Sequence, residues 1–180
     1  IGISAGPATF GYVGQSPLRF VDSKGLDRQG VGSCTLTITE DCGSKAGCCP
    51  YQALMTLSCP GVPDITIPGN SWPSPGNGNP GIRGGRYTGL FCDKCHKGRT
   101  VPGIVLEGDG KIPTLGPNPN NPGSPEWSTH IHVHCGGRNT RGSEGCLTAP
   151  PPHCKLLWDQ LRNFSPIVHV NLQRLPCIAP

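Results

Sequence analysis

The sequence has few charged residues and few aromatic ones. Lys, Arg, Asp and Glu make up 14% of the 180 residues, against roughly 25% in an average soluble domain. The formal net charge is +4, no block of Lys or Arg occurs, and the 3 Trp, 3 Tyr and 4 Phe are not interleaved with basic residues. Nucleic-acid binding needs such basic patches and stacking platforms. We therefore expect no nucleic-acid partner.

Long apolar runs and internal repeats are also absent. No stretch approaches the roughly 20 consecutive apolar residues of a membrane-spanning helix, so we expect no membrane partner. The length fits one domain with its own core. We predict a single domain over residues 1–180 and a monomer.

Glycine, proline and cysteine are abundant, with 27 Gly, 21 Pro and 11 Cys. So much Gly and Pro predicts long loops, and disulfides can stabilise such a loop-rich body. This cysteine usage indicates an oxidising compartment, so we expect a secreted, extracellular protein that starts at Ile1 as a processed mature form. Five disulfides would leave one cysteine over, which raises the question of a reactive thiol.

Alternation of apolar and polar residues predicts strands at 34–40, 86–91 and 101–107, and a closing strand at 167–172. We expect residues 51–57 to form a strand or a short helix. One helix is predicted to begin near Cys154 and to run to Arg162. The stretches 60–85 and 113–125 are rich in Pro, Gly and Asn and predict loops. The predicted fold is therefore mainly β, with one helix packed on it, long Gly/Pro loops and several disulfides.

A short Cys-x-x-Cys-His sequence spans Cys92 to His96 and matches the attachment pattern of c-type haem. With nine other cysteines in the chain, we expect Cys92 and Cys95 to form disulfides instead, with Cys48 and Cys49 as candidate partners. No cofactor is expected.

The candidate catalytic and metal-binding side chains lie close together in the sequence, within residues 130–146. His130, His132 and His134 would share one face of a regular strand, and Cys146 follows at a predicted step from loop to strand. A cysteine needs a neighbouring base to act as a nucleophile at neutral pH, and imidazole is the usual base. Cys146 could instead pair with Cys135, Cys154 or Cys177 in a disulfide. Histidines on one face could also share a metal ion, but no carboxylate partner follows from the spacing, and we assign no metal site.

The run Ser143-Glu144-Gly145-Cys146, with the upstream Ile-His-Val-His-Cys-Gly, resembles the catalytic signature of L,D-transpeptidases. That family carries a histidine on a strand, then a short loop to Ser or Thr, a residue that is often His, and Gly-Cys. The resemblance implies a β-sandwich or barrel with a flanking helix. It also implies cleavage or transfer at D-amino-acid or diaminopimelate bonds of bacterial peptidoglycan stem peptides, through an acyl-cysteine.

The same resemblance implies site roles. Cys146 would be the nucleophile, His134 or His132 the base, and Ser143 a supporting hydrogen-bonding group, with amides near Gly145 and Cys146 as the oxyanion hole. Two positions depart from the family pattern, since Glu144 stands where His is common and Thr148 where Arg or Asn is common.

Glu144 suggests a second enzymatic function. A secreted muramidase cuts the sugar strand with two carboxyl groups, and Glu144 could form that pair with a second acid, for which Glu107, Asp109 and Glu126 are the candidates. In both enzymatic hypotheses residues 1–180 form a single catalytic domain, from which a wall-binding module at one end could have been trimmed. The residues expected to bind substrate in either reading are Glu107, Asp109, Trp127 and Arg141. The third alternative is a secreted binding protein without enzymatic activity.

Overall fold

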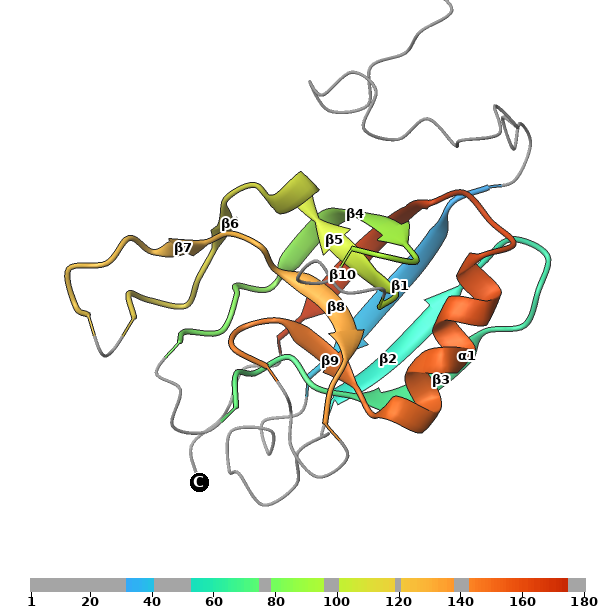
Figure 1. Ribbon diagram of the computed structural model, residues 1–180, viewed down its shortest axis with the longest axis horizontal. Coiled ribbons are helices and arrows are strands. Elements are labelled where there is room, and N and C mark those ends of the chain that lie inside the picture. Colours follow the sequence, from blue (N-terminus) through green and yellow to red (C-terminus); the bar gives the residue numbers. More distant parts are fainter. Residues whose placement is uncertain are drawn as a thin grey trace, which may run out of the picture.

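The structure is a computed structural model that describes residues 32–40, 53–74, 79–95, 101–118, 121–137 and 143–174. Within these residues an eight-stranded sheet has the order β3-β2-β1-β10-β4-β5-β8-β9, and β6 pairs with β7 in a separate arm (Figure 1). The strands are β1 (Cys34–Thr39), β2 (Ala53–Ser58), β3 (Ile65–Gly69), β4 (Gly85–Cys92), β5 (Gly103–Leu106), β6 (Ile112–Pro113), β7 (Trp127–Ser128), β8 (His132–Cys135), β9 (Leu147–Ala149) and β10 (Ile167–Gln173). A 3₁₀ turn, η2 (Glu107–Asp109), follows β5, and the helix α1 spans Pro151–Leu161.

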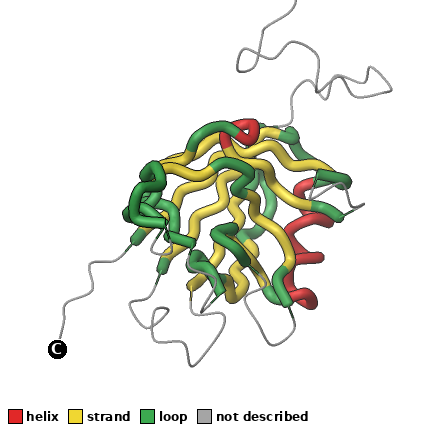
Figure 2. The backbone as a smooth tube through the Cα atoms, turned by 60° about the vertical axis from the view of Figure 1, so that its left-hand side comes forward, coloured by secondary structure: helices red, strands yellow, loops and turns green. Residues whose placement is uncertain are grey.

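The large sheet curls into a nearly closed barrel (Figure 2). Its two edges meet where Asn70, directly after β3, pairs with Thr148 of β9. The Asn70 amide donates to the Thr148 carbonyl at 2.7 Å, and the Thr148 amide donates to the Asn70 carbonyl at 2.9 Å. Most neighbouring strands are antiparallel, but β1 pairs with β10 and β8 with β9 in parallel.

The barrel interior is filled by the apolar half of each alternating strand. Leu36 and Ile38 of β1 lie opposite Val170 and Leu172 of β10, and all four side chains are buried. Gly89 of β4 is required here, because a Cβ at this position would lie 2.4 Å from Ile104 Cγ2. The alternation in the sequence is therefore the direct cause of the core.

The helix α1 packs against β3 and β8. Its buried face presents Cys154, Leu157, Trp158 and Leu161. Cys154 is bonded to Cys135 of β8, and the Trp158 ring stacks on Phe91 with 5.8 Å between the centroids. The sequence prediction began this helix near Cys154. It begins at Pro151 because proline suits the first helical turn, where its missing amide proton breaks no hydrogen bond.

The mainly β fold, the barrel with one flanking helix and the disulfides are confirmed. The predicted last strand at 167–172 is confirmed as β10, which lies between β1 and β4. Two details of the prediction are wrong. The loop over 60–85 contains the strand β3. Cys92 and Cys95 are bonded to each other and not to Cys48 and Cys49, which lie outside the described residues.

No helix in the described ranges is long and apolar enough to span a membrane.

Candidate functional site

The sulfur of Cys146 lies against the backbone at the start of β8. Parallel pairing of β8 with β9 sets Val133 opposite Leu147 and His134 opposite Thr148. Cys146, one residue before β9, therefore lies beside His132. Cys146 carries a thiol, which donates to the His130 carbonyl at 3.7 Å and accepts from the His132 amide at 3.5 Å. The topology thus brings together two residues that are 14 positions apart in the sequence.

The imidazole of His132 is held by a carboxylate. Its Nε2 lies 2.8 Å from Asp109 Oδ1, and the His132 side chain is 7% exposed against 41% for Asp109. A carboxylate only accepts hydrogen bonds, so Nε2 carries the proton in this contact and Nδ1 is the other ring nitrogen. Asp109 can reach His132 because η2 directly follows β5, whose Val105 pairs with His132.

Asp109 is carried by a strained turn. Glu107, Gly108 and Asp109 have φ values of 47°, 57° and 64°, so three consecutive residues are left-handed. This conformation is unfavourable for residues other than glycine and persists where the surrounding structure holds it. The Glu107 carboxylate provides one such constraint, because Oε1 accepts from the Thr88 amide at 2.6 Å. Glu107 therefore supports the turn that presents Asp109.

The turn before β9 is organised around Ser143, which is 3% exposed. Its hydroxyl donates to the Cys146 carbonyl at 2.6 Å and accepts from the Gly145 amide at 3.1 Å. Gly145 has a φ of +134°, which favours glycine. Ser143 therefore fixes the backbone that carries Cys146. The Gly145 amide, expected in the oxyanion hole, is engaged by Ser143 in this structure.

This turn is tied to residues 70–74, which we term the closing segment. The Ser74 amide donates to the Ser143 carbonyl at 2.8 Å, and the Ser143 amide donates to Ser74 Oγ at 3.2 Å. Through Asn70 and Thr148 the same segment closes the barrel. The position of Cys146 therefore depends on the contacts of a segment distant in sequence.

A buried ion pair anchors the closing segment. The carboxylate of Glu40, at the end of β1, is paired with the Arg174 guanidinium after β10 and accepts from Trp72 Nε1. Arg174 also donates to the Ser71 carbonyl at 3.1 Å, and its guanidinium lies 4.4 Å from the centroid of the Trp72 ring. Burial lowers the pKa of Arg174 from its ordinary value, and the charge of Glu40 opposes this shift.

The three histidines do not share one face. His130 precedes β8, is exposed and has a left-handed backbone with φ 58°. His134 is buried, and its Nδ1 is hydrogen-bonded to the carbonyl of Cys135 at 2.7 Å. His132 is thus the histidine that the structure brings to both Cys146 and a carboxylate. Across the described part of the chain, no three His, Cys, Asp or Glu residues form a group that could hold a metal ion.

The other candidate residues lie as follows. Glu144 is exposed on the turn between Ser143 and Gly145. Trp127 is exposed on β7 of the arm, with Lys111 Nζ 4.4 Å from its ring centroid. Arg141 lies outside the described residues. Cys135 and Cys154 are bonded to each other, so neither pairs with Cys146.

Comparison of the chain with protein-family models, with curated proteins and with solved structures finds no match. The likeness to L,D-transpeptidases therefore depends on the motif residues themselves.

Sequence reasoning missed two features of this site. Asp109 is predicted to bind substrate, and this stays a prediction. The hydrogen bond between its carboxylate and His132 was not foreseen, because it depends on the pairing of β5 with β8. The ion pair of Glu40 and Arg174 gave no local signal, because its members are 134 residues apart.

Proposed function

We propose that this protein is a secreted cysteine hydrolase that cleaves stem peptides of bacterial peptidoglycan, with Cys146, His132 and Asp109 as its catalytic group. The observation that supports this proposal is that the Cys146 thiol contacts the backbone of a histidine whose imidazole is hydrogen-bonded to a carboxylate. Nucleophile, base and orienting acid in this order recur in cysteine hydrolases on unrelated folds.

The mechanism follows from these positions. His132 Nδ1 takes the proton from Cys146, and the thiolate attacks the carbonyl carbon of an amide. Asp109 accepts from Nε2 and stabilises the resulting imidazolium. The imidazolium then gives its proton to the leaving amine, which leaves an acyl-cysteine. His132 takes a proton from a water molecule, whose oxygen attacks the thioester and releases the acid and the thiol.

The assignment of the substrate depends on the motif around Ser143 and Cys146. Its likeness to L,D-transpeptidases favours amide bonds next to D-amino-acid or diaminopimelate residues. The disulfides favour action outside the cell, where the wall is accessible.

The test is mass spectrometry of soluble fragments released from purified peptidoglycan. We expect shortened stem peptides on intact glycan, and no release by Cys146→Ala. His132→Ala should reduce the rate by about 10²–10⁴-fold, as expected for loss of a general base. His134→Ala is the matched control, since this buried histidine lies two residues further along the same strand, and it should retain most activity when folded.

The outcomes discriminate between the alternatives. New reducing sugar ends with intact stem peptides, lost in Glu144→Gln, would instead make the protein a muramidase. Release that depends on His134 and not on His132 would overturn the assignment of the base. No fragments from several wall types would refute hydrolysis of the wall.

A further inference from the structure

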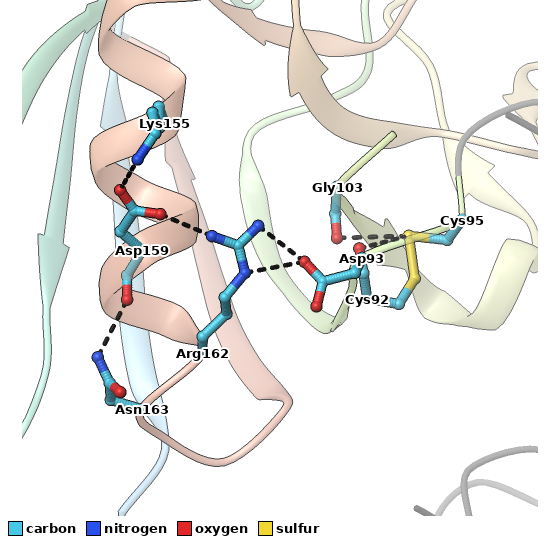
Figure 3. Close-up of polar contacts among 8 residues, drawn as sticks. All are labelled: Cys92, Asp93, Cys95, Gly103, Lys155, Asp159, Arg162 and Asn163. Carbon is cyan, nitrogen blue, oxygen red and sulfur yellow. Dashed lines mark hydrogen bonds and ion pairs between the residues drawn. A yellow bond between two sulfur atoms is a disulfide. The ribbon is translucent and has the colours of Figure 1, made fainter. Parts of the chain in front are cut away.

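The disulfide between Cys92 and Cys95 lies outside the proposed catalytic group. Cys92 is the last residue of β4, and Figure 3 shows the disulfide beside Gly103 of β5 and close to Arg162 at the end of α1. The two cysteines are three residues apart, whereas Cys34–Cys59 and Cys135–Cys154 span 25 and 19 residues. A disulfide that closes so short a ring restrains the unfolded chain least, so its loss costs the fold least.

Burial also differs among the three disulfides that the structure describes. Cys34, Cys59 and Cys154 are at most 6% exposed, and Cys135 is half-buried. Cys92 and Cys95 are both half-buried, and the two residues between them, Asp93 and Lys94, are exposed. Thiol–disulfide exchange requires an attacking thiolate to reach a sulfur atom. Among the described disulfides, Cys92–Cys95 is therefore the one in which neither cysteine is fully buried.

The two sulfur atoms have different surroundings. Cys95 Sγ lies 3.2 Å from the Cys92 carbonyl oxygen and 3.4 Å from the Gly103 carbonyl oxygen (Figure 3). Two carbonyl oxygens repel an approaching thiolate, but they can accept a hydrogen bond from a thiol. Attack is thus directed to Cys92, and Cys95 is the sulfur that holds a proton after the bond has opened.

The loop that carries these cysteines has a second attachment that does not involve sulfur. Asp93 Oδ1 accepts from Arg162 Nε at 3.0 Å and pairs with Nη2 at 2.9 Å, and Arg162 Nη1 donates to Asp159 at 2.6 Å (Figure 3). The hydrogen bond to Asp93 is the largest cause of the raised pKa of Arg162. Because this ion pair involves no sulfur atom, it can hold the loop when the disulfide opens, and an oxidised dithiol can then close the two thiols again.

We propose that Cys92–Cys95 is a reversible thiol–disulfide exchange site whose substrates are dithiols, either small molecules or protein Cys-x-x-Cys groups. A thiolate of the dithiol attacks Cys92 Sγ, the Cys92–Cys95 bond breaks, and Cys95 leaves and takes up a proton. The second thiol of the dithiol loses its proton and attacks the mixed disulfide. This step forms the disulfide of the substrate and releases Cys92, which takes up a proton. Two electrons and two protons pass to the protein, and the dithiol is oxidised.

The test is equilibration of the folded protein in buffers of increasing ratio of reduced to oxidised dithiothreitol. Alkylation and peptide mass spectrometry then report each cysteine. We expect Cys92–Cys95 to open at a ratio at least about tenfold lower than either Cys34–Cys59 or Cys135–Cys154, with an unchanged circular dichroism spectrum. The proposal is overturned if Cys92–Cys95 opens only together with the other two disulfides, as the chain unfolds.

A second measurement tests the anchor. After the reductant is replaced by oxidised dithiothreitol, which accepts the two electrons, the Cys92–Cys95 disulfide should close several-fold more slowly in Arg162→Ala than in the parent chain. Lys155→Ala is the control, because Lys155 pairs with Asp159 on the helix but not with Asp93. Equal reclosure rates in the parent and Arg162→Ala would refute the role of the ion pair. None of these readouts requires activity of Cys146, so the exchange site and the hydrolase can fail independently.

Discussion

Gly145 shows how one residue can determine the position of the candidate nucleophile. An Ala methyl there would lie 3.6 Å from Ile131 Cδ1, an ordinary contact, so the cost of Gly145→Ala arises from the backbone at φ +134°. We expect a loss of about 1–3 kcal/mol in the free energy of unfolding and a lower rate of fragment release, since relaxation of the turn moves Cys146. Urea unfolding and fragment release measure the two effects.

Gly61 provides the matched control for this prediction. It has a φ of +73°, and a Cβ there would meet nothing within 4 Å. It lies between β2 and β3, outside the turn of residues 143–146. Gly61→Ala should therefore lower stability and preserve the rate per folded molecule. If Gly145→Ala also preserves that rate, the turn does not control the nucleophile.

Tyr87 makes stability depend on alkaline pH. Burial is the largest cause that raises its pKa above the ordinary 10.0, and Arg174 opposes this shift. The neutral hydroxyl is thus favoured in the folded state. Its contribution is fully present below pH 10.0 and is lost as the pH rises through the folded-state pKa. Above pH 10.0 the free energy of unfolding should fall by at most about 1.4 kcal/mol per pH unit for this one proton.

Tyr87→Phe separates this effect from the general alkaline loss of stability. The variant loses the hydrogen bond from the Tyr87 hydroxyl to the Arg83 carbonyl, 2.6 Å long, and should be less stable by about 1 kcal/mol at neutral pH. Its stability should then decline less steeply above pH 10.0 than that of the parent. Parallel pH profiles of urea unfolding for the two proteins would contradict the role of Tyr87.

At the scale of single elements, strands with clear alternation could be predicted and those without it could not. The patterns at 34–40 and 86–91 correspond to β1 and β4. β3 was missed because Pro68 lies within it among many turn-forming residues. Pro68 is tolerated because β3 is an edge strand of the sheet, where a missing amide proton breaks fewer ladder bonds.

The candidate site could be predicted in its residue types but not in its pairing. The motif identified Cys146 together with three histidines predicted on one strand face, of which His134 or His132 was the candidate base. It could not choose between His132 and His134, because both satisfy the period of two. The parallel register of β8 with β9 places Cys146 beside His132, and the pairing of β5 with β8 brings Asp109 to the imidazole of His132. Both are long-range features that no local pattern encodes.

At the scale of the whole molecule, closure of the barrel and geometry of the site depend on the same contacts. The Glu40–Arg174 pair holds Ser71 and Trp72, and the segment that contains them bonds to both Thr148 and Ser143. Glu40 is 3% exposed, so its charge is compensated almost wholly by groups of the protein. Removing one partner of such a pair leaves an uncompensated buried charge.

Glu40→Gln should therefore lower the free energy of unfolding by about 3–5 kcal/mol, measured by urea denaturation, and fragment release should decline with it. The double variant Glu40→Gln/Arg174→Met should recover part of this loss, because it also removes the Arg174 charge, which the single variant leaves buried without a counter-charge. Glu126→Gln is the control, since the Arg83–Glu126 pair is exposed at 52% and 58% and should contribute less than about 1 kcal/mol. Equal losses in Glu40→Gln and Glu126→Gln would mean that β3 and β9 are held together by Asn70 and Thr148 alone, without help from the ion pair.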